Sequence, residues 1–200
     1  EMGAVAQPLA IAWHAAKRAE LGCNVLVMGA GLVSRSGCSS RPTHGLTCSR
    51  SDRAHDRSQH QVLGREFGAT VLDVRAPGFD LAVTKAATAA YGADVVFDCV
   101  GTQASLAAVR RRGNIMNLAA WKVKPVVDML KLVLSEVSII SACGLLLGMC
   151  GVTADDEFRF VGLEDIITRR IGLEEPVEKG IKGYIHEKNE MSTWLTHRLA

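Results

Sequence analysis

Residues 24–31, with the sequence Asn-Val-Leu-Val-Met-Gly-Ala-Gly, constrain the fold of this chain more than any other stretch. Four apolar residues lead into a Gly-x-Gly turn, which is how a dinucleotide-binding βαβ unit begins. Gly29 permits the tight turn, and Gly31 lets the backbone approach a pyrophosphate at the N-terminus of the next helix. Ser34 stands where the full fingerprint has a third glycine. Because Gly-x-Gly also occurs in tight turns that bind no ligand, the motif indicates nucleotide binding without establishing it.

The rest of the chain alternates short apolar strands with longer helical patterns. Strands are predicted at residues 70–73, 94–101 (ending in a glycine) and 114–118, and helices over residues 8–18, 79–91, 103–112 and 125–135, with a helix end at 61–68. This alternation predicts an α/β fold of the Rossmann-like type, a doubly wound parallel sheet with helices on both faces. Ligands of such sheets bind beyond the carboxyl ends of the strands.

Glycines and polar residues gather where these strands end. The candidate cofactor-binding residues are Gly29 and Gly31 after the first strand, Asp98 and Gly101 after a later one, and Asn117 with Ala119 after the next. The carboxyl ends of parallel strands share one edge of the sheet, so these residues are predicted to line a common site. The alternative is that Asp98 and Asn117 only cap turns.

The composition of the chain argues against several kinds of partner. Of its 200 residues, 48% are hydrophobic, which is enough to bury a core. A net charge of +2, from 23 basic and 21 acidic residues, gives no general attraction to nucleic acid or to membranes. The six cysteines include no Cys-x-x-Cys pair, and no apolar stretch is long enough to span a bilayer. We expect a cytoplasmic protein without disulfides or a membrane segment.

Five segments of the chain together resemble one enzyme family. They are residues 7–15, 25–31, 94–101, 166–171 and 175–182. They look like parts of the zinc-dependent medium-chain dehydrogenases, most closely the 2,3-butanediol and sorbitol dehydrogenase branch. The resemblance implies a domain that binds NAD or NADP. It also implies a small secondary alcohol or polyol as substrate, oxidised to a ketone by hydride transfer while zinc polarises the alcohol oxygen.

The resemblance covers only the cofactor-binding half of the family. Members also have a barrel-like domain that supplies the zinc ligands and the proton relay, and these 200 residues contain no counterpart of it. Gln7 replaces a glutamate of that branch, and a neutral amide is a poor zinc ligand. His14 is interpreted as a packed or partly exposed helix residue rather than as a replacement zinc ligand. We therefore assign no metal site and no catalytic residue, and expect a truncated chain without dehydrogenase activity. The alternative is a catalytically silent paralogue that acts through its fold and self-association.

Residues 34–61 are atypical within a Rossmann-like domain that is predicted over residues 1–190. They hold seven serines, five arginines and three histidines, but only one large aliphatic residue, Leu46. A disordered insert or a shifted reading frame would give this composition, and the sheet is expected to lack its second strand. Asp52 stands near the position of the acid that binds ribose in such folds, but it is not assigned that role. The arginines also permit a phosphate- or RNA-binding module, although no aromatic residue or lysine accompanies them.

Self-association is predicted at one edge of the sheet. Residues 137–143 have the pattern of a strand, and in the family the corresponding edge strand pairs with its symmetry mate. Because an apolar edge must be paired or covered, we expect a homodimer with Ile139 or Ile140 near the contact. The alternative is that the tail from Ile166 onward covers this edge. Residues 191–200 form an atypical tail that does not resemble the final strand of the family.

Overall fold

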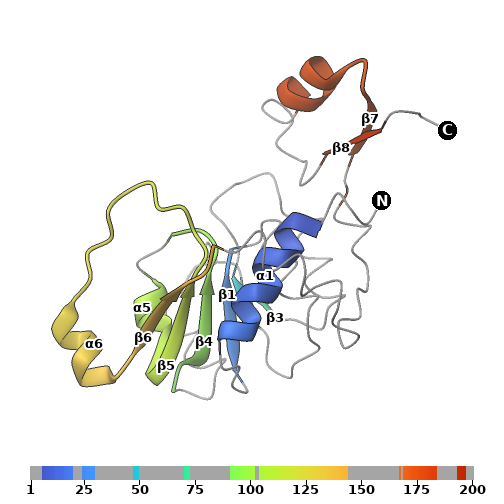
Figure 1. The fold of residues 1–200 in the computed structure, drawn as a ribbon. Coiled ribbons are helices and arrows are strands. Elements are labelled where there is room, and N and C mark those ends of the chain that lie inside the picture. Colours follow the sequence, from blue (N-terminus) through green and yellow to red (C-terminus); the bar gives the residue numbers. More distant parts are fainter. Residues whose placement is uncertain are drawn as a thin grey trace.

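A six-stranded parallel sheet forms the centre of the fold (Figure 1). The computed structural model describes residues 6–19, 24–29, 47–49, 70–72, 91–101, 104–143, 167, 169–183 and 193–196. In spatial order the strands are β3 (Thr70–Leu72), β2 (Thr47–Ser49), β1 (Val25–Met28), β4 (Ala93–Asp98), β5 (Val109–Asn117) and β6 (Ser138–Ser141). The direction of strand addition reverses between β1 and β4, as it does in dinucleotide-binding sheets. The predicted α/β, Rossmann-like fold is therefore confirmed.

The second strand of the sheet is present, and the expectation that it would be missing is wrong. β2 lies parallel to β1 on one side and to β3 on the other, with Thr47 beside both Leu26 and Thr70. The hydrophobic pattern of the sequence did not predict β2, because hydrogen bonds between backbone groups hold this strand in the sheet. Three residues held between two strands need no apolar run of their own. The remainder of residues 34–61, including Asp52 and the arginines, lies outside the described residues.

Helices cover both faces of the sheet, which explains why its central strands β1 and β4 are apolar on both sides. One face holds Ala15, Val25, Val27, Val95, Phe97 and Met116, and the other holds Leu26, Met28, Val96, Ala108 and Ile115. Ala15 belongs to α1 (Ala6–Arg18), which has a buried proline in its first turn and two basic residues in its last. The helix predicted over residues 8–18 is confirmed.

The helix predicted over residues 103–112 is much shorter than expected. α5 (Ser105–Ala108) has four residues, and β5 begins at Val109, inside the predicted helix. The pairing of β5 with β4 is irregular at this end. Arg110 forms an ion pair with Asp94 of β4, and Arg112 has a left-handed φ of 59°. Pairing with β4 thus overrides a local sequence that favours a helix.

The helix predicted over residues 125–135 begins four residues late, at Met129. The carboxylate of Asp128 accepts a hydrogen bond from the N–H of Lys131 at 3.0 Å, which caps the first turn of α6 (Met129–Ser135). The helix ends at Glu136, which has a left-handed φ of 50°. None of the seven residues of α6 is buried, so this helix adds no side chain to the core. β6 follows as predicted and forms one end of the sheet.

The C-terminal segments form a second, two-stranded sheet. β7 (Arg169–Gly172) pairs in parallel with β8 (Thr193–Thr196), and the π-helix η3 (Pro176–Lys182) lies between them in the sequence. A strand is therefore present within residues 191–200, despite their atypical sequence. In the part of the chain that the structure describes, the outer edge of β6 pairs with no strand, and no helix is long and apolar enough to cross a membrane.

Candidate functional site

Four residues stand in one row across the carboxyl ends of neighbouring strands. The backbone register places Met28 beside Asp98, Asp98 beside Asn117, and Asn117 beside Ser141. Gly29 follows β1 directly, is buried, and has a φ of 116°, a conformation that favours glycine. Because the sheet order reverses between β1 and β4, Gly29 lies at the switch point where such sheets bind their ligands.

The structure brings most of the predicted site residues to this edge. Gly29, Asp98, Gly101, Asn117 and Ala119 all lie at or just beyond the ends of β1, β4 and β5. The ladders continue to this level, since the N–H of Cys99 donates to the Met28 carbonyl at 3.1 Å and the N–H of Leu118 donates to the Asp98 carbonyl at 2.9 Å. Gly31 lies outside the described residues.

The carboxylate of Asp98 builds the turn that follows β4. It is 1% exposed, and it accepts hydrogen bonds from the N–H of Val100 at 3.0 Å, the N–H of Gly101 at 2.7 Å and the hydroxyl of Ser105 at 2.8 Å. A buried carboxylate with three donors is satisfied and fixed in place. These contacts agree with the alternative interpretation, in which Asp98 caps a turn. Ser105, which the sequence analysis did not single out, contributes one of the three donors.

Trp121 lies at the candidate site but was not predicted from the sequence. Its indole Nε1–H donates to Oδ1 of Asn117 at 2.9 Å, and the Asn117 amide nitrogen lies 3.4 Å from the Ser141 hydroxyl oxygen. The ring also packs over Gly101, where a Cβ atom would stand 3.3 Å from ring atoms of Trp121. Gly101 has a φ of 77°, so both the backbone and this contact favour glycine. An aromatic residue four positions after a strand end was the only sequence signal.

The described residues do not form a zinc site. They include no group of three or more His, Cys, Asp or Glu side chains placed to hold a metal ion. Gln7, at the start of α1, is exposed and carries no charge, and His14 is half-buried on the same helix.

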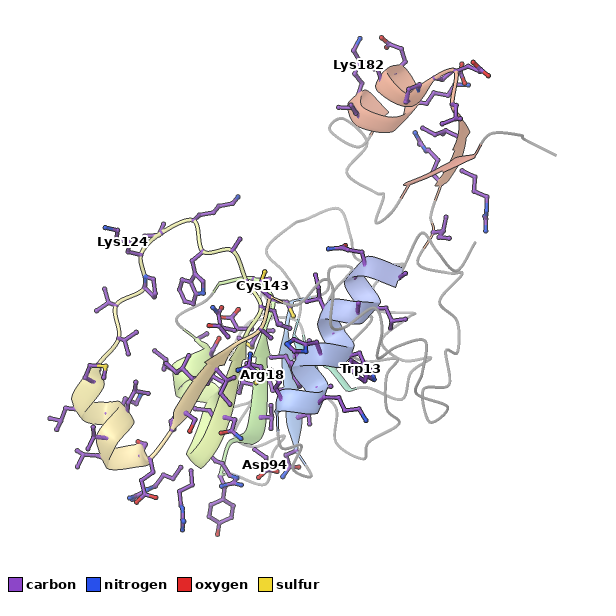
Figure 2. All side chains as sticks on the ribbon, viewed as in Figure 1. Trp13, Arg18, Asp94, Lys124, Cys143 and Lys182 are labelled. Atoms are coloured by element: carbon purple, nitrogen blue, oxygen red, sulfur yellow. The ribbon has the colours of Figure 1, made fainter. Side chains whose placement is uncertain are left out.

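The one shifted pKa in the described part of the chain belongs to a carboxyl group far from this edge. Asp94 lies at the amino end of β4, and Figure 2 shows it at the opposite end of the sheet from Cys143, which follows β6. Burial raises the pKa of Asp94, but hydrogen bonds from the N–H of Asn24 and from Arg110 outweigh burial and hold the pKa below its ordinary value. This shift concerns stability rather than the candidate site.

The strand order, the glycine at the switch point and the row from Met28 to Ser141 define a Rossmann-like α/β domain of the dinucleotide-binding type. Comparison with known proteins agrees with this class. No family model matches the chain. In sequence, the chain is 27% identical over 134 residues to (R,R)-butanediol dehydrogenase of Saccharomyces cerevisiae, which covers 63% of this chain and 35% of that protein.

Two solved structures illustrate the similarity in fold. The 2R,3R-butanediol dehydrogenase of Bacillus subtilis matches with a TM-score of 0.83 and 18% identity, over 98% of this chain and 57% of that one. A short chain alcohol dehydrogenase from Escherichia coli CFT073, complexed with NADH, matches with a TM-score of 0.77 and 16% identity, over 96% and 58%. The chain thus spans little more than half of these structures. The resemblance to the zinc-dependent medium-chain dehydrogenases of the butanediol dehydrogenase branch is confirmed, over their cofactor-binding part.

Proposed function

We propose that the chain is the cofactor-binding part of an NAD- or NADP-dependent alcohol or polyol dehydrogenase, which oxidises a secondary alcohol to a ketone by hydride transfer. The observation that carries this proposal is the buried, left-handed Gly29 at the switch point, beside the row from Met28 to Ser141. The sequence similarity to a butanediol dehydrogenase supports a secondary alcohol as the class of substrate.

The described residues fit a dinucleotide in outline. The backbone at Gly29 has no side chain to hinder a pyrophosphate, and the adjoining carboxyl ends offer small and polar groups, notably Ala119 and the Asn117 amide. In such sheets the adenosine half lies over the first three strands and the second mononucleotide over the others. By this rule the nicotinamide half of the cofactor lies over β4, β5 and β6. When bound, the cofactor supplies the hydride chemistry, and this chain supplies binding and orientation.

Calorimetry with NADH tests the cofactor proposal. We expect weak binding, with a dissociation constant in the high micromolar to millimolar range, because Ser34 replaces the third glycine and no residue is assigned as the ribose acid. Ala119→Glu should weaken NADH binding about tenfold, since it adds bulk and a negative charge beside the nicotinamide half of a cofactor that already carries a dianionic pyrophosphate. Ala120→Glu is the matched control, because Ala120 is the exposed neighbour of the half-buried Ala119. Absence of NADH binding to the unmodified chain, or equal losses in both variants, would contradict the proposal.

We also propose that these 200 residues, tested by themselves, do not complete the oxidation. Hydride transfer in the resembled family needs zinc to stabilise the alkoxide, and the ligands that the resemblance implies are not among these residues. An assay with NAD and either 2,3-butanediol or sorbitol should therefore show no turnover. A rate that a chelator abolishes would show that this chain does carry a metal site.

A second candidate function, self-association without catalysis, is favoured by the open edge of the sheet. The N–H of Ala142 donates to the Asn117 carbonyl, so the backbone groups of Ile139 and Ser141, which alternate with it, face away from β5. Arg18 reaches the Ser141 carbonyl at 2.6 Å, but no described strand pairs with this edge. We propose a homodimer through β6, either within the dehydrogenase or in a catalytically silent paralogue.

A further inference from the structure

The loop after β5 contacts two strand ends through the side chain of Trp121, and Asn117 extends these contacts to a third. Trp121 donates to Asn117 at the end of β5, and its ring lies on Gly101, just beyond the end of β4. Asn117 in turn reaches Ser141 at the end of β6. Trp121 and Asn117 together therefore join the strand ends over which the second mononucleotide of a dinucleotide lies.

The hydrogen bond from Trp121 decides which way the Asn117 amide points. An asparagine amide has one accepting and one donating end, and an indole N–H can only donate. The bond at 2.9 Å therefore fixes Oδ1 of Asn117 toward Trp121 and leaves Nδ2 on the side of β6, 3.4 Å from the Ser141 hydroxyl. Nδ2 carries two protons, and the long contact with Ser141 involves only one of them. The fixed amide thus presents a hydrogen-bond donor at the edge of the site.

We propose that Trp121 is a positioning residue, which orients Asn117 so that its Nδ2 group donates to an oxygen acceptor on the nicotinamide half of NADH. This inference rests on the proposed dinucleotide function. It adds to that function the pair Trp121 and Asn117, which acts on the nicotinamide half of the cofactor and not on the adenosine half. Without the indole N–H, the amide can rotate and offer its oxygen instead, which repels an acceptor on the ligand.

The test compares NADH with 5′-AMP, which contains only the adenosine half. Trp121→Phe keeps an aromatic ring against Gly101 and removes the N–H, and Asn117→Ala removes the donor itself. Each variant should weaken NADH binding about fivefold, the usual effect of one hydrogen bond, and should leave 5′-AMP binding unchanged. Trp13→Phe is the control, because it makes the same substitution in a tryptophan of α1, which has Lys17 over its ring, rather than in the loop after β5.

A double variant separates positioning from general stability. If Trp121 acts through Asn117, the double variant should bind NADH no more weakly than Asn117→Ala alone, because the two losses are one interaction. Unchanged NADH binding in Trp121→Phe, equal losses for NADH and 5′-AMP, or additive losses would each overturn the role of Trp121. If Trp121→Phe fails to fold, Asn117→Ala still tests the proposal. Equal losses of 5′-AMP and NADH binding in that variant would overturn it. If the unmodified chain binds neither ligand, the dinucleotide function falls as well, so the two failures are distinguishable.

Discussion

Asp94 links the amino ends of β4 and its two neighbouring strands. Its carboxylate accepts the N–H of Asn24, just before β1, at 2.8 Å and forms an ion pair with Arg110 at the start of β5. The side chain is 15% exposed, so solvent screens these bonds only in part. One carboxylate thereby joins β4 to both of its neighbours, at the end of the sheet away from the candidate site (Figure 2).

The depressed pKa of Asp94 predicts how this contact depends on pH. Because the pKa in the folded chain lies below the ordinary value of 3.8, the ionised carboxylate stabilises the fold above that value. The contribution disappears as the pH falls through the lower pKa of the folded chain. We expect Asp94→Asn to lower the free energy of unfolding by about 1–2 kcal/mol at neutral pH, as for hydrogen bonds to a charged group.

Urea unfolding of both chains as a function of pH checks this prediction. The difference between them should be constant at neutral pH and should shrink below about pH 4. Asp128→Asn is a matched control, since Asn caps a helix as well as Asp does and Asp128 is exposed. A difference that persists unchanged into strong acid would show that the charge of Asp94 is not what stabilises this contact.

At the scale of elements, apolar runs located most of the sheet. β1 and β4 are near their predicted positions, because a strand buried on both faces must be apolar along its length. β6 is also near its predicted position, and its Ile140 packs against the core. β2 escaped prediction because its place depends on backbone pairing with two neighbours. The predicted boundary between α5 and β5 was wrong, because β5 begins early through tertiary contacts that the local sequence does not reveal. These contacts are the ion pair of Asp94 with Arg110 and the irregular pairing beside it.

The candidate site was predictable only in part. Gly29, Asp98, Gly101, Asn117 and Ala119 could be placed together, since the carboxyl ends of parallel strands always share one edge. Their individual roles could not be read from the sequence. That Asp98 builds a turn depends on three donors, including Ser105, and that Asn117 is oriented depends on Trp121. Such contacts arise from the folded loops and leave no periodic pattern in the chain.

At the scale of the whole molecule, the proposed homodimer depends on the outer edge of β6. Ile139 is 44% exposed, whereas Ile140 packs against the core cluster that includes Ala15. Of the two isoleucines expected near a dimer contact, Ile139 therefore lies on the accessible side, and a charge at Ile140 would disturb the core. An exposed edge strand that no charge protects offers its free backbone groups to a second copy.

We expect the unmodified chain to sediment as a dimer and Ile139→Lys to sediment as a monomer at the same concentration. Lysine on an edge strand opposes pairing because its charge must stay hydrated, while its backbone still allows β6 to pair with β5. Leu173→Lys is the matched control, since Leu173 is similarly exposed, at 48%, and follows β7 in the second sheet. Sedimentation velocity over a wide range of concentrations distinguishes the outcomes. An unmodified chain that stays monomeric at high concentration, or dimers that survive Ile139→Lys but not Leu173→Lys, would exclude β6 as the contact.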